Sequence, residues 1–335
     1  MTKNILITGG AGYVGGCLVP KLLAQNYNVL VYDILYFGKD HLPLNHPNLK
    51  VVEGDIRDID NLSQNLKNID TVLHLACISN DPSFELDQGL SQSINYDCFE
   101  PMVMAAKEAG VARFIYCSTC SVYGISDAPE VKEDHPKIPI TLYNKFKGMC
   151  EPLLMKHQSK NFTCSVIRPA TIGGYSSRTR LDLTVNILTF HALTKKVITV
   201  FGGEQTRPNL DIQDMCDLYS LVIECPKEKI EGEIFNVGNK NIKIFDIAMS
   251  IKKIIEEKYP DLGIINVKKT ESNDARSYRI NSDKVFQTIG FKPKRDINDS
   301  IISICEAFKK GLLDESCGKN VWYNNVQTMK EINAK

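Results

Sequence analysis

The sequence has no excess of charge of either sign. Its 335 residues include 40 basic and 40 acidic side chains, so the formal net charge at pH 7 is zero. A protein that binds nucleic acid usually carries a basic patch or stripe that neutralises phosphates. The composition shows no such surplus, and we expect no nucleic-acid partner. A local patch for a phosphate-bearing small molecule is still compatible with zero net charge.

Long hydrophobic runs are also missing. No segment approaches the roughly 20 apolar residues that a membrane-spanning helix needs. The first apolar run, residues 5–7, ends at Thr8-Gly9-Gly10 and is too short for the apolar core of a signal peptide. We therefore expect a cytoplasmic protein without a membrane partner.

The cysteines do not form a paired set. Their number, eleven, is odd, and they are scattered through apolar segments, as is typical of reduced core thiols rather than of a disulfide framework. Cys117 and Cys120 match Cys-x-x-Cys, but no second pair and no adjacent histidine accompany them, so we expect no bound metal. The hydrophobic (43%) and charged (24%) fractions are ordinary for a globular chain, and the length predicts about two domains.

A glycine-rich turn follows the first predicted strand, residues 4–8. Gly9, Gly12 and Gly15 lead into an apolar-periodic segment that reaches Leu23, so the order is strand, turn, helix. Glycines at this spacing permit a tight turn and let backbone amides approach a pyrophosphate at the positive end of the helix. The pattern predicts a dinucleotide-binding site.

An acidic residue follows the second predicted strand, residues 28–32. Asp33 lies where a carboxylate can bind the hydroxyls of the adenosine ribose. The same charge repels the 2′-phosphate of NADP, and no arginine follows before Arg57. NAD is therefore the expected cofactor.

Further strands are predicted at residues 50–52, 71–75 and 113–117, with helical stretches between them. This alternation is typical of an α/β fold with a Rossmann-type, doubly wound parallel sheet, in which ligands bind at the carboxyl ends of the strands. Asp55 would then lie near the adenine, and residues 75–77 would border the cofactor.

Tyr143 and Lys147 form a Tyr-x-x-x-Lys just past the proline-rich run 129–139, where a helix is expected to begin. Four residues apart, both would lie on one helix face. An ammonium near a phenol lowers the phenol's pKa from about 10, which makes it a usable base near neutral pH. Thr119, after the strand at 113–117, can donate a hydrogen bond to a substrate oxygen whose charge changes in the reaction.

Together these motifs resemble the extended short-chain dehydrogenase/reductase family, the NAD-dependent nucleotide-sugar epimerases and dehydratases. The resemblance spans nearly the whole chain and rests on residues 8–15, Asp33, residues 54–56, Leu75, Ala76, Asn95, residues 118–124, Tyr143, Lys147, Arg168 and Pro169. It implies that Tyr143 is the base, that Lys147 holds the nicotinamide ribose and tunes Tyr143, and that Thr119 orients the sugar hydroxyl. The cofactor-binding residues that it implies are Gly9, Gly12, Tyr13, Val14, Gly15, Asp33, Asp55, Ile56, Leu75, Ala76, Cys77, Asn95, Tyr143, Lys147 and Pro169.

Segments of the second half resemble substrate-binding parts of the same family. Residues 178–186 are similar to a segment of nucleotide-sugar enzymes, including the GDP-heptose 4-dehydrogenases, whose asparagine contacts the sugar nucleotide. Arg207 is expected at the diphosphate, where a guanidinium forms charge-assisted bonds, and Asp214 is placed to cap the next helix. The substrate-binding residues implied are Thr119, Ser121, Tyr143, Asn186, Arg207 and Arg276.

Two departures from the family pattern narrow the reaction. Family dehydratases carry Asp-Glu directly after the position of Thr119, where this chain has Cys120 and Ser121. Elimination of water is therefore disfavoured. The 3,5-epimerases place a cysteine at the position of Ser121, so inversion at C5 is not expected either. Of the reactions that the resemblance implies, hydride transfer at one carbon, C4, is the one still expected.

The resemblance also predicts how the chain is organised. Residues 1–169, with a returning segment at about 211–240, would form the NAD-binding domain, and residues 170–210 and about 241–335 a smaller, mixed α/β substrate domain. The helix near residues 91–109 and the Tyr143 helix can form a four-helix interface, so we expect a homodimer. No function can be read from the C-terminal tail around Trp322.

The expected function is NAD-dependent 4-epimerisation of a nucleotide-diphosphate sugar through a transient 4-keto sugar. A 4-dehydrogenase that releases the keto sugar, as in GDP-heptose processing, is the first alternative. A dinucleotide-binding regulator without turnover is the second; Thr119, Tyr143 and Lys147 argue against it, because a pure binder needs no tuned base. The base and the sugar of the substrate cannot be read from the sequence.

Overall fold

Seven parallel strands form the central sheet of the computed structural model, which describes residues 3–271 and 277–333. Their order across the sheet is β10-β6-β5-β4-β1-β2-β3. They are β1 (Asn4–Thr8), β2 (Asn28–Asp33), β3 (Leu49–Glu53), β4 (Thr71–His74), β5 (Arg113–Cys117), β6 (Thr163–Pro169) and β10 (Glu233–Val237). The doubly wound parallel sheet expected from the sequence is confirmed.

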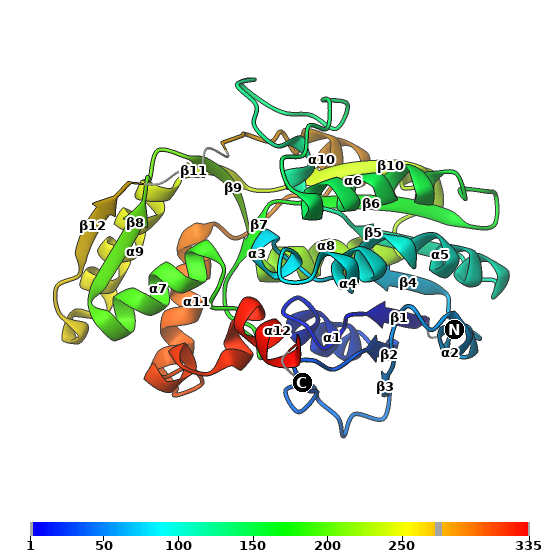
Figure 1. Cartoon of the computed structure of the whole chain (residues 1–335), viewed down its shortest axis with the longest axis horizontal. Helices are drawn as coiled ribbons and strands as arrows, with labels where there is room; N and C mark the ends of the chain where they lie inside the picture. Colours follow the sequence, from blue (N-terminus) through cyan, green and yellow to red (C-terminus); the bar gives the residue numbers. More distant parts are fainter. Residues whose placement is uncertain (1–2, 272–276, 334–335) are drawn as a thin grey trace.

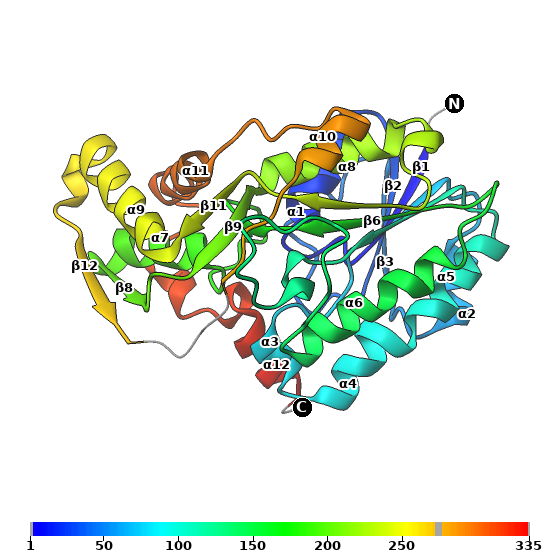
Figure 2. The ribbon, with the colours of Figure 1, turned by 90° about the horizontal axis from the view of Figure 1, so that it is seen from above.

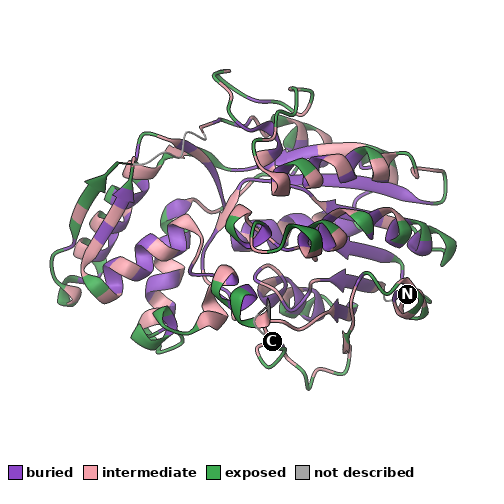
Figure 3. Cartoon of the chain, viewed as in Figure 1, coloured by how far each residue is buried: buried purple, intermediate pink, exposed green. Residues whose placement is uncertain are grey.

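Helices cover both faces of this sheet (Figures 1 and 2). One face carries α1 (Gly15–Ala24) and α8 (Ile212–Glu224), and the other carries α2 (Ile59–Asn65), α5 (Phe99–Glu108) and α6 (Leu142–Met155). Strands covered on both sides are buried along their whole length and mostly apolar. All seven residues of β6 are buried, and the buried sheet is visible as the purple band in Figure 3.

A second lobe lies beyond the carboxyl ends of the strands. It contains a three-stranded sheet, a two-stranded sheet and three helices around a core of their own. Its elements are β7 (Thr171–Gly173), β9 (Thr206–Asp211), β11 (Lys240–Lys243), β8 (Val197–Phe201), β12 (Asn266–Thr270), α7 (Thr184–Lys195), α9 (Ile244–Lys258) and α11 (Ile297–Lys309). The other α-helices of the described residues are α3 (Asp81–Phe84), α4 (Gln88–Gln92), α10 (Asp283–Ile289) and α12 (Asn325–Asn333).

The strand order reverses between β1 and β4, which pair with each other at the centre of the sheet. Connections leave such a neighbouring pair in opposite directions and open a crevice, where doubly wound folds bind ligands. The crossover from β2 to β3 is an irregular loop, residues 34–48, rather than a helix. This loop and the one after β4 border the crevice.

The helix expected at residues 91–109 is interrupted. α4 gives way to a π-helical turn, Ser93–Asp97, and α5 begins only at Phe99. A π turn holds one residue more than an α turn and is common at functional sites. Here the buried Asn95 sits in that turn, and its side chain bonds to both backbone groups of Ile78 in the loop after β4.

Asp211, not Asp214, caps α8. Asp211 Oδ1 accepts the amide of Gln213 at 2.8 Å. Asp214 lies one turn further on, where its buried carboxylate accepts the amides of Lys294 (3.1 Å) and Arg295 (2.8 Å). The expected cap was wrong because the helix begins before Asp214, which instead ties the segment before α11 to α8.

A buried ion pair joins β6 to α6. Arg168 donates through Nε and Nη2 to the two carboxylate oxygens of Glu151, at 2.9 and 2.7 Å. Ser118 Oγ (2.7 Å) and Lys137 Nζ (2.9 Å) donate to the same carboxylate, and Arg168 Nη1 donates to the hydroxyl of Tyr123. Burial by itself would raise the pKa of Glu151, but its cationic partners outweigh burial and lower it.

Breaking this ion pair should destabilise the protein strongly. Glu151→Ala leaves the Arg168 charge buried without its partner, which typically costs about 3–5 kcal/mol. Because the pKa of Glu151 is lowered in the folded state, its contribution is complete above the ordinary glutamate pKa of about 4.3 and disappears as the pH falls through the folded-state value. Urea unfolding at pH 7 measures the change. The double variant Glu151→Leu/Arg168→Met should recover part of the loss, and a loss below about 1 kcal/mol for Glu151→Ala would contradict the assignment.

Candidate active site

A cavity of about 550 Å³ runs along the carboxyl ends of β1, β2, β4 and β5. This volume is in the range of small-ligand sites, roughly 300–1,000 Å³. The residues predicted from the sequence that line it are Gly9, Gly12, Tyr13, Val14, Asp33, Asp55, Ile56, Leu75, Ala76, Cys77, Thr119, Ser121, Tyr143, Lys147, Pro169 and Arg207. The structure thus brings the glycine turn, the acid after β2 and the Tyr-x-x-x-Lys helix to one hollow.

Three predicted site residues do not line the cavity, and a fourth, Arg276, lies outside the described residues. Gly15 opens α1, behind the wall of the cavity. Asn95 positions the loop after β4 through Ile78 instead of lining the cavity. Asn186 is fully buried: its Oδ1 accepts the amide of Gly174 (2.9 Å) and its Nδ2 donates to the carbonyl of Arg180 (2.9 Å). Its expected contact with the substrate has no support in this geometry, because its amide is used to hold residues 174–180.

The glycine turn fits a dinucleotide. Gly9 has φ +72°, and a Cβ there would lie 2.6 Å from the backbone of Ala76. A Cβ on Gly15 would lie 2.0 Å from the carbonyl oxygen of Gly10, so the chain can turn this tightly only without side chains. The turn brings Gly12 and Val14 to the cavity wall at the start of α1, where backbone amides attract a diphosphate.

Asp33 is the last residue of β2 and lines the cavity where a ribose is expected. Its Oδ2 accepts the amide of Ala11 (2.9 Å) and its Oδ1 the amide of Leu35 (2.8 Å). Burial raises the pKa of Asp33, and these two amides lower it in part. A carboxylate can accept about four hydrogen bonds. Capacity therefore remains for the two ribose hydroxyls of an adenosine, and these residues fit NAD.

The proposed catalytic groups come from two neighbouring elements. Tyr143 and Lys147 lie on α6, which begins at Leu142 behind the N-cap Thr141. Thr119 follows β5, and its Oγ1 accepts the amide of Ser121 at 3.1 Å. Lys147 Nζ donates to the carbonyl of Cys117 at 2.5 Å and lies 4.8 Å from the centroid of the Tyr116 ring.

The pKa of Tyr143 is raised, not lowered as the sequence led us to expect. Burial is the largest cause, followed by the nearby thiols of Cys77 and Cys117 and the carboxylate of Asp81, while Arg180 acts in the opposite direction. The expectation rested on the spacing to Lys147 alone. In the structure the phenol is buried deeply enough for desolvation to dominate.

Two arginines near the cavity were missed. Arg180 lines it close enough to Tyr143 to affect its pKa; its Nε and Nη2 bind the carboxylate of Asp182 (2.9 and 3.0 Å), and its Nη1 donates to Ser79 Oγ (3.0 Å). Arg178, two residues earlier, lies with its guanidinium 3.7 Å from the centroid of the Phe37 ring. The sequence did contain a sign of these two arginines, the Arg-x-Arg at residues 178–180. That segment resembles part of the sugar-nucleotide enzymes, but a role was predicted only for its asparagine.

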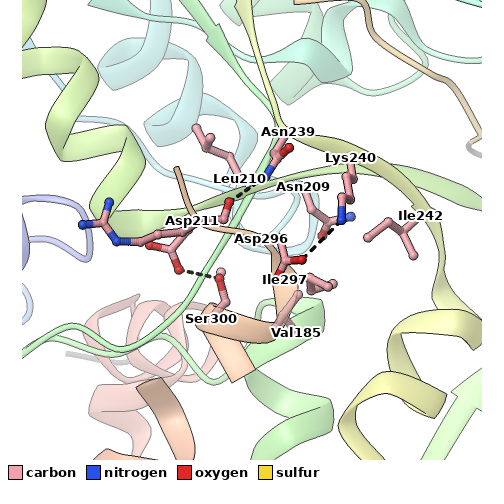
Figure 4. A pocket seen from close by; sticks show the side chains of 12 residues that line it. Val185, Asn209, Leu210, Asp211, Asn239, Lys240, Ile242, Asp296, Ile297 and Ser300 are labelled. Carbon is pink, nitrogen blue, oxygen red and sulfur yellow. Dashed lines mark hydrogen bonds and ion pairs between the residues drawn. The ribbon is translucent and has the colours of Figure 1, made fainter. Parts of the chain in front are cut away.

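A second hollow lies between β9, β11 and α11 (Figure 4). Asp211 accepts a bond from Ser300 Oγ (2.6 Å) across it, and Lys240 pairs with Asp296 (3.2 Å). Its volume of about 10 Å³ holds no more than a water molecule. It is therefore too small for a ligand and is a packing seam inside the second lobe.

Fold and site together define an NAD-binding α/β enzyme of the Rossmann type. The sequence profile of the NAD dependent epimerase/dehydratase family matches residues 5–238. UDP-glucose 4-epimerase of Lactobacillus helveticus is 26% identical over 319 residues, which cover 90% of this chain and 95% of that protein. dTDP-D-glucose 4,6-dehydratase of Homo sapiens is 28% identical over 326 residues, 92% of this chain and 90% of that one.

A solved structure of a related epimerase has the same fold as this chain. UDP-glucuronic acid 4-epimerase from Bacillus cereus, in complex with UDP-glucuronic acid and NAD, superposes with a TM-score of 0.80 at 25% identity, over 91% of this chain and 100% of that one. The chain belongs to the NAD-dependent epimerase/dehydratase family, and its cofactor is NAD. Members of the family include epimerases, dehydratases and decarboxylases.

Within residues 3–271 and 277–333, no helix combines the length and the apolar character needed to cross a bilayer.

The buried phenol gives a spectroscopic prediction. In protein stripped of cofactor, Tyr143 should stay protonated at its ordinary pKa of about 10, because burial favours the neutral form. Alkaline difference absorbance of tyrosinate, wild type minus Tyr143→Phe, should be flat up to pH 10 and rise only above it. A one-tyrosine difference that titrates below pH 9 would show that the charge environment, not burial, controls this group.

Proposed function

We propose that this chain is an NAD-dependent 4-epimerase of a nucleotide-diphosphate sugar. The observation that carries the proposal is that the segment after Thr119 offers no carboxyl group to the cavity. Ser121 lines the cavity, and its Oγ lies 3.2 Å from the hydroxyl of Tyr278. Cys120 is fully buried, and its thiol donates to the carbonyl of Arg168 at 2.9 Å. Elimination of water requires an acid here, so a dehydratase is disfavoured.

The carboxylates that do line the cavity are engaged by other groups. Asp55 pairs with Arg57, and Asp182 pairs with Arg180. Asp81 accepts the hydroxyl of Thr141 at 2.6 Å, and Asp33 accepts two backbone amides. A group held in this way has a structural or cofactor-binding use, which supports hydride transfer without dehydration.

The reaction follows from the roles of these side chains. In the cofactor-free protein burial keeps Tyr143 protonated, and the positive charges of Lys147 and of bound oxidised NAD would favour its phenolate. That phenolate accepts the proton of the C4 hydroxyl, and Thr119 donates a hydrogen bond to that sugar oxygen. Bound beside these side chains, NAD would supply the chemistry of reversible hydride transfer at C4. Lys147 would hold the nicotinamide ribose. The keto sugar then rotates in the pocket, so that the hydride returns to its other face. Tyr143 gives the proton back, and the configuration at C4 is inverted.

Cationic groups in the second half suit a nucleotide diphosphate. Arg207, on β9, lines the cavity, as does Arg180 before α7. Guanidinium groups form charge-assisted, often bidentate bonds with phosphates. The relatives named above act on or bind UDP and dTDP sugars, which supports a substrate of that class without identifying its base.

The alternative is a 4-dehydrogenase that releases the keto sugar. The observation that favours it is the likeness of residues 178–186 to the corresponding segment of the GDP-heptose 4-dehydrogenases. The two reactions share Tyr143, Lys147 and Thr119 and differ in whether the hydride returns to the same sugar. The fate of the cofactor therefore distinguishes them.

Turnover on a panel of UDP, GDP, CDP and dTDP sugars tests the proposal. We expect a 4-epimer of one sugar with little net absorbance in the NADH band, and a 10²- to 10⁴-fold lower kcat for Tyr143→Phe, about the contribution of a general acid or base. Tyr96→Phe is the matched control, since Tyr96 packs on Phe146 and does not line the cavity. Accumulating NADH would favour the dehydrogenase, unchanged kcat in Tyr143→Phe would refute the mechanism, and no turnover on any sugar would favour the regulator.

We also propose a homodimer through the outer faces of α5 and α6, which lie side by side (Figure 2). Met104 on α5 is 45% exposed there. Light scattering at micromolar concentration should give twice the chain mass of 37.6 kDa, and Met104→Glu should shift it toward one chain because a charge is costly in an apolar interface. Met249→Glu, at the exposed Met249 on α9, is the control and should leave the mass unchanged. A wild-type mass of one chain excludes the dimer.

A further inference from the structure

The C-terminal segment, residues 319–332, lies across two loops that border the cavity. In Figure 1 its helix α12, drawn in red, sits beside α3 and in front of α1. Asn325, Val326 and Met329 of this helix line the same cavity as Gly12 and Asp33. The tail from which the sequence suggested no function is therefore part of the cofactor cavity's wall.

Hydrogen bonds attach the segment to both loops. On the side of β2, Trp322 Nε1 donates to the carbonyl of Phe37 at 2.5 Å, and its ring meets His41 edge-on at 5.7 Å. On the side of β4, Asn325 Nδ2 donates to Ser79 Oγ at 2.9 Å. The segment thus bridges the loop that follows Asp33 and the loop that follows β4.

Arg178 also holds the C-terminal segment in place. Its Nη2 donates to the carbonyl of Trp322 (3.1 Å) and to Asn325 Oδ1 (2.7 Å), and its guanidinium lies on the Phe37 ring. The backbone just before it is fixed to the glycine turn, because Ser176 Oγ donates to the carbonyl of Tyr13 (2.7 Å) and Ser177 Oγ to that of Gly16 (3.0 Å). The guanidinium is therefore held at the diphosphate and adenosine end of the cavity.

The charge of Arg178 is not balanced by an ion pair. It is 1% exposed, its Nε has no hydrogen-bond partner, and within the described residues no carboxylate lies at ion-pair distance. Burial, with Arg180 nearby, lowers its pKa to about 9. Asp182 and Asp33, which lie beyond ion-pair distance, oppose this lowering only in part. A buried guanidinium without a carboxylate in direct contact is unfavourable. A dianionic diphosphate at the adjacent glycine turn would offset that cost.

We propose that residues 319–332, together with Arg178 and Phe37, form part of the cofactor-binding site and enclose the adenosine half of NAD. The cofactor cannot leave until the bonds of Trp322 and Asn325 to the two loops break. An epimerase must keep its reduced cofactor until the hydride returns to the same sugar, so retention of NAD would serve the proposed function. Only this use of the enclosure rests on the epimerase proposal; the enclosure itself does not. Slow exchange is the measurable consequence.

Exchange of bound NAD against excess labelled NAD tests this enclosure without any sugar. Asn325→Ala removes the bonds to Ser79 and Arg178, and Trp322→Phe removes the bond to the Phe37 carbonyl while keeping a ring. We expect each to speed exchange by about tenfold or more, equivalent to about 1.4 kcal/mol. Gln327→Ala, on the exposed face of the same helix, is the matched control and should exchange like wild type.

The outcomes separate the two proposals. If wild-type NAD exchanges within the mixing time, or if both variants stay within twofold of wild type, the enclosure is wrong even when epimerisation is observed. If exchange accelerates in the variants but no sugar is turned over, the enclosure stands and the proposed reaction falls. Thermal unfolding of each variant checks its fold, and Trp322→Phe alone decides the matter if Asn325→Ala does not fold.

Discussion

The buried ion pair of Arg168 and Glu151 is the interaction on which the arrangement of the proposed catalytic groups depends. Arg168 belongs to β6 and Glu151 to α6, the helix that presents Tyr143 and Lys147. Ser118 and Tyr123 attach the segment around Thr119 to the same pair. Charge-assisted bonds from a planar guanidinium fix direction as well as distance. One pair of charges in the core therefore joins the strand, the helix and the loop that carry or border the proposed catalytic groups Tyr143, Lys147 and Thr119.

The neutral composition conceals an uneven distribution of charge. The first half offers the cofactor mainly backbone amides, the glycine turn and the carboxylates of Asp33 and Asp55. Cations reach the cavity chiefly from the second half, as Arg178, Arg180 and Arg207. The cofactor and the proposed substrate each carry one diphosphate group, and both would meet these cations where the two halves of the chain face the same cavity.

The central sheet and the cofactor end of the site could be read from the sequence because their signals are local. A buried parallel strand is a continuous apolar run, and the glycine turn and Asp33 follow their strands directly. What the sequence did not reveal depends on contacts between distant residues. Trp322 contacts Phe37 and Asn325 contacts Ser79. The residues of each pair are far apart in the sequence, so no spacing pattern indicates that they meet.

The errors have the same origin. The substrate contact of Asn186 stays a prediction, but the bonds of its amide to Gly174 and Arg180 could not be foreseen, because only the folded chain brings these residues to it. The acidity of Tyr143 was inferred from a lysine four residues away, whereas burial by remote segments controls it. Asp214 was placed at a helix end that lies three residues earlier, a shift too small for sequence patterns to resolve.

The position of β10 has a consequence for the order in which the protein is made. This edge strand pairs with β6, and its Asn236 accepts the hydroxyl of Tyr123 at 2.7 Å, beside the ion pair. Yet β10 is translated after β7, α7, β8 and β9 of the second lobe. Until residue 237 has left the ribosome, β6 has no partner on β10's side of the sheet and is an open edge, the kind of surface that invites mispairing. The nascent chain therefore carries an incomplete cofactor half through the synthesis of much of its other half.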